Sequence, residues 1–215
     1  MFLKILVILS SCFIAYILSS FNFAIFISKK FYHKNIKKLG SKNAGMTNVL
    51  RNFGTVPAII TLVGDIFKGF LSILICHILC HKVLNPEIFM CFKYIVLIFA
   101  LLGHIFPIFY NFKGGKGISV VTGAILFINV KIFLILLTIF ILVFKFSKIV
   151  SLSSLSSTFA FPIATFLTNY FNNKTTHSTA LIITSITTIA SIIVIFAHKE
   201  NIIRLLKKKE PKIKK

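Results

Sequence analysis

Long apolar segments dominate the chain, and short polar segments separate them. The apolar runs lie near residues 3–28, 55–81, 88–110, 118–146, 150–170 and 179–197. Several of them contain about 18 or more residues with almost no charge, which is the length that an α-helix needs to cross the hydrocarbon of a bilayer. The pattern predicts an all-α, polytopic membrane protein in which residues 1–215 form a single integral-membrane domain.

The fourth run is the longest, and Asn129 and Lys131 interrupt it. It is either one tilted helix or two short helices joined by a tight turn. Two short helices give seven crossings and place the basic segment 29–54 and the basic tail on the same side. Together with segments 113–117 and 145–148, that side then holds 19 of the 25 Lys and Arg residues. Because positive charge is enriched on the cytoplasmic side, we expect seven transmembrane helices, with the N-terminus outside and the C-terminus cytoplasmic.

Composition supports the membrane assignment and limits the alternatives. The chain is 57% hydrophobic and only 13% charged, yet its net charge is +21. Such a charge is also typical of nucleic-acid binding, but here the basic residues flank apolar spans and no soluble segment could carry a nucleic-acid fold. The first run resembles a signal peptide but lacks a clear cleavage site. We therefore interpret it as an uncleaved first span and expect no nucleic-acid partner.

The first polar stretch, LGSKNAGMTNVLRNFG (39–54), combines glycines with small hydrogen-bonding side chains. Glycine permits close approach of the backbone to a ligand, and the Arg51 guanidinium suits a phosphate. An ordinary solvated loop would also contain glycine and asparagine. The candidate ligand-binding residues of this stretch are Ser41, Asn43, Thr47, Asn48 and Arg51.

The second polar stretch, KGGKG (113–117), lies just before an apolar helix. Glycine amides at such a position can bind anions, and Lys113 and Lys116 add positive charge. The spacing is not that of a Walker A loop. We expect Gly114, Gly115 and Gly117 to donate amides to a phosphate. His104 precedes this loop, and a histidine at a helix end is more often structural than catalytic.

Further polar residues begin or follow the later helices. Ser151 lies in SKIVSLSSLSS (147–157), where serines either contact a ligand or pack helices together. His198, Glu200, Asn201 and Arg204 follow the last span at helical spacing, and residues 198–215 form a basic cytoplasmic tail. Asp65 and Lys68 lie inside the second run, where charges are costly and are usually paired or functional.

The residues also exclude several enzyme classes. Four acidic residues cannot supply the clustered carboxylates of a magnesium-dependent phosphotransferase. The H-x4-D spacing of soluble-type glycerolipid acyltransferases and the G-x-S-x-G elbow are both missing from the sequence. An enzyme built from these residues would handle phosphate with Arg, Lys and amides, and we expect neither a metal nor a cofactor.

The motifs GSKNAGMTNVLRNFG, GHIFPIFYNFKGGKG, VSLSSL and HKENIIRLL resemble those of the bacterial acyl-phosphate:glycerol-3-phosphate acyltransferases (PlsY family), as do DIFKG and SSFNFAIFISK. The resemblance runs from about residue 16 to about residue 212. Lys42, Ala44 and Met46 replace the glycine, proline and alanine usual in the first motif. Ser153 stands where the family commonly has glycine, and the family's tail commonly has a glycine near Lys208.

The resemblance implies a multi-pass enzyme of phospholipid biosynthesis in the bacterial cell (inner) membrane, with its active site facing the cytoplasm. It implies acyl transfer from acyl phosphate to the 1-hydroxyl of sn-glycerol 3-phosphate, giving lysophosphatidic acid and phosphate. The soluble enzyme that makes acyl phosphate is a transient partner by analogy. The implied catalytic residues are Ser41, Arg51, Lys116, His198 and Asn201. The implied substrate-binding residues are Asn43, Thr47, Asn48, His104, Lys113, Gly114, Gly115, Gly117 and Ser151.

The proton acceptor for the attacking hydroxyl stays open between His198, His104 and the leaving phosphate, with the phosphate slightly favoured. A transporter or channel is the main alternative from another class, and a structural membrane subunit is a third. A transporter predicts polar residues at mid-membrane on broken helices, whereas most polar features here fall on one side of the predicted topology.

Overall fold

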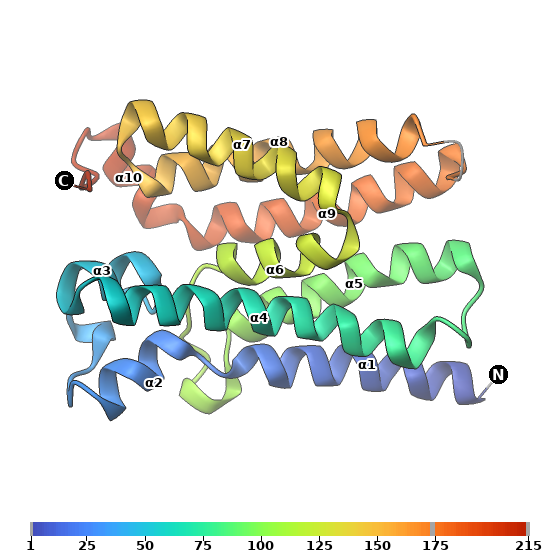
Figure 1. The fold of residues 1–215 in the computed structure, drawn as a ribbon, viewed down its shortest axis with the longest axis horizontal. Coiled ribbons are helices and arrows are strands. Elements are labelled where there is room, and N and C mark those ends of the chain that lie inside the picture. The colour runs from blue at the N-terminus through green and yellow to red at the C-terminus, as the bar shows by residue number, and fades with distance from the viewer. Residues whose placement is uncertain (1, 173–174, 214–215) are drawn as a thin grey trace. The chain divides into compact units, whose positions relative to one another are not determined.

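The computed structural model describes residues 2–172 and 175–213, which form helices joined by short loops, with no strand among them (Figure 1). The all-α prediction is confirmed. The chain divides into two compact units, Met1–Ile128 and Asn129–Lys215. These are called the first and the second unit below, and each is described by itself. A single domain over residues 1–215 stays a prediction.

The first unit holds the helices that come before Asn129. Its α-helices and short 3-10 helices are α1 (Phe2–Ser20), α2 (Phe23–Lys30), η1 (Ile36–Lys38), α3 (Met46–Phe53), α4 (Thr55–Cys80), α5 (Pro86–Ile105), η2 (Ile108–Tyr110) and α6 (Ile118–Ile128). Helix α4 contacts all the other described α-helices of this unit, so it is the central helix.

Glycines allow α4 and α6 to pack closely. A Cβ atom on Gly69 of α4 would lie 2.0 Å from the carbonyl oxygen of Val120, and one on Gly123 of α6 would lie 1.8 Å from that of Ile66. Small residues at such crossings let helix backbones approach within a membrane. The two glycines therefore set the separation of α4 and α6.

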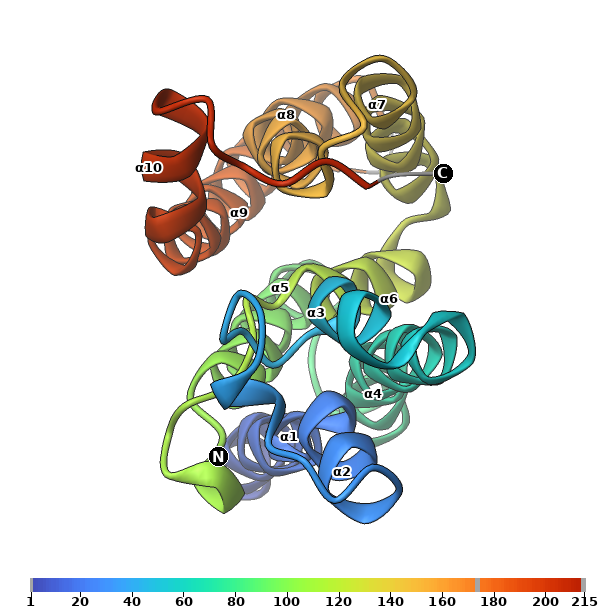
Figure 2. The same cartoon turned by 90° about the vertical axis from the view of Figure 1, so that its left-hand side faces the viewer.

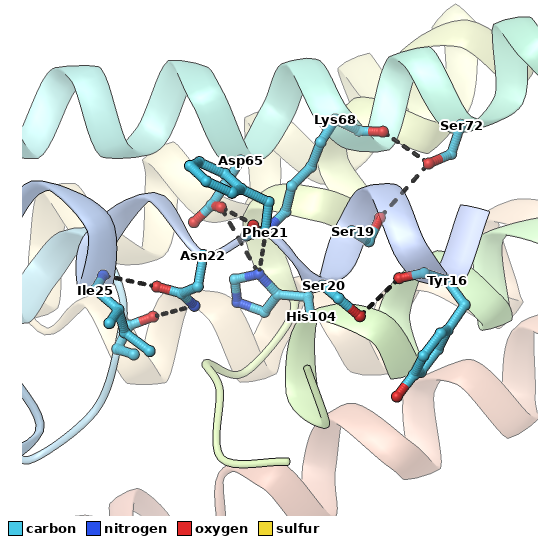
Figure 3. A network of polar contacts seen from close by, with 11 residues as sticks. Tyr16, Ser19, Ser20, Phe21, Asn22, Ile25, Asp65, Lys68, Ser72 and His104 are labelled. Carbon is cyan, nitrogen blue, oxygen red and sulfur yellow. Dashed lines mark hydrogen bonds and ion pairs between the residues drawn. The ribbon is translucent and has the colours of Figure 1, made fainter. Parts of the chain in front are cut away.

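The first apolar run is not one continuous helix. It breaks at Phe21 and Asn22 into α1 and α2. Asn22 is fully buried and caps α2, because its Oδ1 accepts from the Ile25 amide at 3.0 Å. Its Nδ2 donates to the Ala44 carbonyl at 3.2 Å. The break therefore ties the membrane run to the first polar stretch (Figure 3).

The fourth apolar run forms two helices, and Asn129 separates α6 from α7 (Val130–Ser147). Asn129 caps α7 by accepting from the amides of Lys131 and Ile132 at 3.0 and 3.3 Å. Six helical segments of the described residues are long and apolar enough to cross a membrane, whereas α6 has only 11 residues. The division of the run is confirmed, and seven crossings stay a prediction.

The second unit is a row of three long helices with a short one at the end of the last. Figure 2 shows α7, α8 (Val150–Tyr170) and α9 (His177–Ala197) side by side, and α8 contacts both of the others. Helix α10 (Lys199–Leu206) follows α9 after His198.

Adding a methyl group at the α4–α6 crossing should separate the two helices. We expect Gly69→Ala to lower the apparent melting temperature in detergent, with a cost of about 1–3 kcal/mol because the Val120 backbone must shift. Gly64→Ala is the matched control, since its new methyl would meet the Phe23 ring, a side chain that can move more readily than backbone. Equal melting temperatures for the two variants would contradict this packing.

Candidate active site

Asn48 organises the first polar stretch from inside. Its side chain is buried, and its Nδ2 lies 3.0–3.2 Å from the carbonyl oxygens of Ile36, Leu39 and Asn43. Its Oδ1 accepts from the amide of Ser41 at 3.1 Å. These contacts use both amide hydrogens of Asn48. Of the two roles open to this residue, shaping the loop and positioning a substrate, the geometry supports the first.

The other predicted residues of this stretch are more accessible. Ser41, Asn43 and Thr47 are partly buried, and Arg51 is exposed. Thr47 and Arg51 are four residues apart on α3, so they lie on the same side of that helix. This arrangement presents a hydroxyl and a guanidinium from one short helix.

The KGGKG loop folds back onto the end of α5. The amide of Gly114 donates to the Ile105 carbonyl at 2.9 Å, and the amide of Gly115 donates to the His104 carbonyl at 3.1 Å. The expectation that both amides bind phosphate is therefore corrected, because main-chain carbonyls already accept from them. Gly117 has φ +86°, which favours glycine, and Lys116 is partly buried beside it.

The two polar stretches of the first unit meet at Gly115. A Cβ atom there would lie 2.2 Å from His104 Nε2 and 2.8 Å from the Ala44 carbonyl oxygen. Only glycine leaves room for the His104 ring and the Ala44 backbone together. The glycine that looked suited to an anion nest is thus required by close packing.

A lysine also joins the two stretches. Lys37 Nζ donates to the Lys113 carbonyl at 2.6 Å. Burial lowers the pKa of the Lys37 ammonium, and the neighbouring charge of Lys113 lowers it further. Positive charge therefore accumulates where the segment before α3 meets the KGGKG loop.

In the second unit, the polar groups converge on Glu210 of the tail. Its carboxylate accepts from Ser151 Oγ at 2.8 Å, from Asn201 Nδ2 at 2.6 Å and from Arg204 Nε at 2.7 Å. Burial raises the pKa of Glu210, but the hydrogen bonds, from Arg204 first, outweigh it and lower the pKa overall. The side chain is only 5% exposed.

Sequence reasoning missed Glu210. It interpreted residues 198–215 as a basic tail, and the available signal was one acidic residue among many lysines. The structure folds this tail back, and the amide of Ile213 donates to the Lys148 carbonyl at 3.0 Å. The side chains of the predicted site residues Ser151 and Asn201 both donate to the Glu210 carboxylate.

His198 is buried between α9 and α10, and its Nδ1 lies 2.8 Å from the Val194 carbonyl oxygen. A carbonyl oxygen can only accept, so Nδ1 carries the hydrogen. In the neutral ring of His198, Nε2 is then the nitrogen without a hydrogen.

His104 has the opposite arrangement. It is buried near the end of α5, and its Nδ1 lies 2.9 Å from the Lys68 ammonium (Figure 3). Nδ1 also lies 3.7 Å from Asp65 Oδ1. A charged ammonium can only donate, so with Lys68 in that form Nδ1 accepts and Nε2 carries the hydrogen. In this form His104 cannot accept a proton from a substrate at Nε2.

The predicted site residues fall into the two units. Within the described segments, no group of three or more His, Cys, Asp or Glu side chains could hold a metal ion. The first unit contains Ser41, Asn43, Thr47, Asn48, Arg51, His104, Lys113, Gly114, Gly115, Lys116 and Gly117, and the second contains Ser151, His198 and Asn201.

Solved structures share this fold. The chain is similar to the crystal structure of PlsY (YgiH), an integral membrane glycerol 3-phosphate acyltransferase, in its glycerol 3-phosphate form, with a TM-score of 0.79, 28% identity and 96% of each chain covered. The lysophosphatidic acid form of that enzyme matches with a TM-score of 0.79 and 26% identity, covering 96% of this chain and 95% of that one.

Sequence comparison agrees. The glycerol-3-phosphate acyltransferase of Staphylococcus carnosus is 36% identical over 202 residues, covering 94% of this chain and 95% of that protein. The enzyme of Fusobacterium nucleatum is 38% identical over 205 residues, covering 94% and 97%. The family model described as glycerol-3-phosphate acyltransferase matches residues 9–208. The chain therefore belongs to the glycerol-3-phosphate acyltransferase family of integral membrane enzymes.

Proposed function

We propose that this protein transfers a fatty acyl group from acyl phosphate to the 1-hydroxyl of sn-glycerol 3-phosphate. The hydroxyl oxygen bonds to the acyl carbonyl carbon, the carbon–oxygen bond of the anhydride breaks, and phosphate leaves. The products are lysophosphatidic acid and phosphate. The observation that carries the proposal is the meeting of the two polar stretches at Gly115, which is followed by Lys116 and lies between the apolar helices α5 and α6 in the chain.

Both substrates carry phosphate, so the site must supply positive charge with little opposing charge. The chain has a net charge of +21 and four acidic residues. We assign Lys116, with the Gly117 amide, to the phosphate near the reacting carbonyl. Ser41 and Arg51 then hold the same or the second phosphate, because a guanidinium can bind two phosphate oxygens at once. Asn43 and Thr47 line the same stretch.

An acyl phosphate is already activated, so positioning and charge stabilisation can supply most of the catalysis. Because His104 presents a hydrogen at Nε2, the proton of the attacking hydroxyl goes elsewhere. We assign it to the departing phosphate. We assign His198 a role in orienting glycerol 3-phosphate, with its ring fixed by the hydrogen that Nδ1 donates to the Val194 carbonyl.

The second unit supports this role through its tail. Ser151 and Asn201 hold the Glu210 carboxylate, and this fixes the start of α8 against the turn of α10. We propose that Ser151 and Asn201 contribute to the site chiefly by keeping His198 in place, because α10 begins directly after it.

The same proposal includes the topology. The division of the fourth run at Asn129 permits seven crossings if α6 crosses a locally thinned bilayer or is tilted. The N-terminus is then outside, and the active site faces the cytoplasm of a bacterial cell, at the inner membrane where there are two. Acyl phosphate would be delivered by a transient contact with the soluble enzyme that makes it.

The donor can be identified in detergent, where transport has no meaning. We expect purified protein to convert labelled glycerol 3-phosphate into lysophosphatidic acid with palmitoyl phosphate, releasing one phosphate per product. Palmitoyl-CoA and palmitoyl acyl carrier protein, tested in parallel, should give at most about a hundredth of that rate. Equal rates with palmitoyl-CoA would overturn the donor assignment, and no product with any donor would favour a transporter or a structural subunit.

The phosphate ligands can be tested by single substitutions. We expect Arg51→Ala and Lys116→Ala each to lower kcat/KM about 100-fold or more, as loss of a charge-stabilising donor does. Arg51→Lys should restore little, because an ammonium cannot replace the guanidinium fork. Lys38→Ala, which removes one exposed charge from the same part of the chain, should behave like the unmodified protein. Full activity of Arg51→Ala or Lys116→Ala would contradict the assignment.

The rate of a His198 variant and its pH dependence distinguish two roles for this residue. If His198 only orients the substrate, His198→Gln should lower kcat about 10-fold and leave the shape of the pH–rate profile unchanged. Loss of a general base typically costs about 100- to 10,000-fold and would remove the acidic limb of that profile. The second result would show that His198, and not the leaving phosphate, takes the proton.

A further inference from the structure

Two charged residues of α4 are buried within a candidate membrane span. Asp65 is 1% exposed and Lys68 is 3% exposed, on the segment Thr55–Cys80. Charges at such depth are costly unless they are paired, and they usually serve a function. The reaction proposed above uses neither residue.

Three acceptor atoms from three segments surround the Lys68 ammonium. Nζ lies 2.8 Å from Asp65 Oδ1, 2.6 Å from the Phe21 carbonyl oxygen and 2.9 Å from His104 Nδ1 (Figure 3). The carboxylate and the carbonyl both favour the charged ammonium, which has three hydrogens to donate. Lys68 therefore joins α4 to the α1–α2 break and to the end of α5.

The ammonium decides which nitrogen of His104 carries the hydrogen. With Nδ1 accepting from Lys68, the neutral ring is held as its Nε2–H form and in one orientation. His104 Nε2 packs against Gly115, where an added Cβ atom would lie only 2.2 Å from it. The same Cβ atom would lie 2.8 Å from the Ala44 carbonyl oxygen. The His104 ring thus contacts the ion pair through Nδ1 and contacts Gly115, where the two polar stretches meet, through Nε2.

Two further hydrogen bonds attach the two polar stretches to His104 and to the α1–α2 break. The His104 carbonyl accepts from the Gly115 amide. Asn22, the residue after Phe21, donates to the Ala44 carbonyl. Moving the Phe21–Asn22 break or the His104 ring would therefore change the position of one stretch relative to the other.

We propose that Asp65, Lys68 and His104 are positioning residues, in which the buried ion pair fixes the Nε2–H form of His104 and thereby sets the spacing between residues 41–45 and 113–117. This inference rests on the proposed function. In this proposal the charges of Asp65 and Lys68 cancel, His104 is neutral, and the three residues contact the two loops but not the substrate. A purely structural ion pair would stabilise the fold without controlling the histidine or the rate.

A double variant separates positioning from stability. Lys68→Met alone leaves the Asp65 carboxylate buried without its cation, so we expect it to unfold readily. Asp65→Asn combined with Lys68→Met removes both charges at similar volume, so the fold should persist, with a melting temperature within a few degrees of the unmodified protein. Its kcat should still fall at least 10-fold with a smaller change in KM, because misplacement of about 1 Å can cost that much or more.

Ser72→Ala is the matched control. Ser72 is buried on α4 one turn beyond Lys68 and donates to the Lys68 carbonyl at 2.8 Å. It does not contact His104 in Figure 3, so its removal should leave kcat within about twofold. A double variant as active as Ser72→Ala would overturn the proposal.

A spectroscopic measurement tests the histidine independently of the reaction. The ¹⁵N shifts of the His104 ring distinguish a protonated from an unprotonated nitrogen. The unmodified protein should show a hydrogen on Nε2 alone, and the double variant a mixture of both forms. A hydrogen on Nδ1 in the unmodified protein would overturn the proposal even if acyl transfer is confirmed. Conversely, absence of transfer from acyl phosphate would refute the proposed function and leave this measurement valid.

Discussion

A polar group in hydrocarbon must find its partners within the protein, because no water is there to supply them. In the first unit this requirement falls on Asn22 and Lys68, which are both buried within candidate membrane spans. Each of them bonds to segments that are distant in sequence, as Asn22 does to Ala44 and Lys68 does to Phe21 and His104. The loops of the candidate site are held by these buried contacts, which hydrophobic packing alone could not direct.

The sequence predicts the features that depend on local pattern, but it does not reveal those that depend on partners distant in the chain. Apolar runs indicate the helices, and the charge distribution favours the division that the structure has at Asn129. The break at Asn22 lies in an apolar run, and its reason, the Ala44 carbonyl, is 22 residues away. Glu210 was missed for the same reason, since its partners Ser151 and Asn201 meet only in the folded chain.

The candidate site also has features that the sequence predicts and features that only the folded chain reveals. Motifs identify the two stretches that meet at Gly115, but the glycine pattern alone does not reveal where the amides point. Gly114 and Gly115 donate to the end of α5, so side chains such as Lys116 and Arg51 must supply most of the positive field. Glycine is needed at position 115 because the His104 ring and the Ala44 backbone occupy the space.

The arrangement of Asp65 and Lys68 has a consequence for how the protein is made. Three residues apart, they lie on the same face of one helix and can neutralise each other before any other helix is present. Helix α4 is synthesised before α5, so His104 cannot yet help when α4 leaves the translocon. An ion pair between two different helices would expose a lone charge to lipid at that moment, whereas this one enters the membrane as an internally balanced segment.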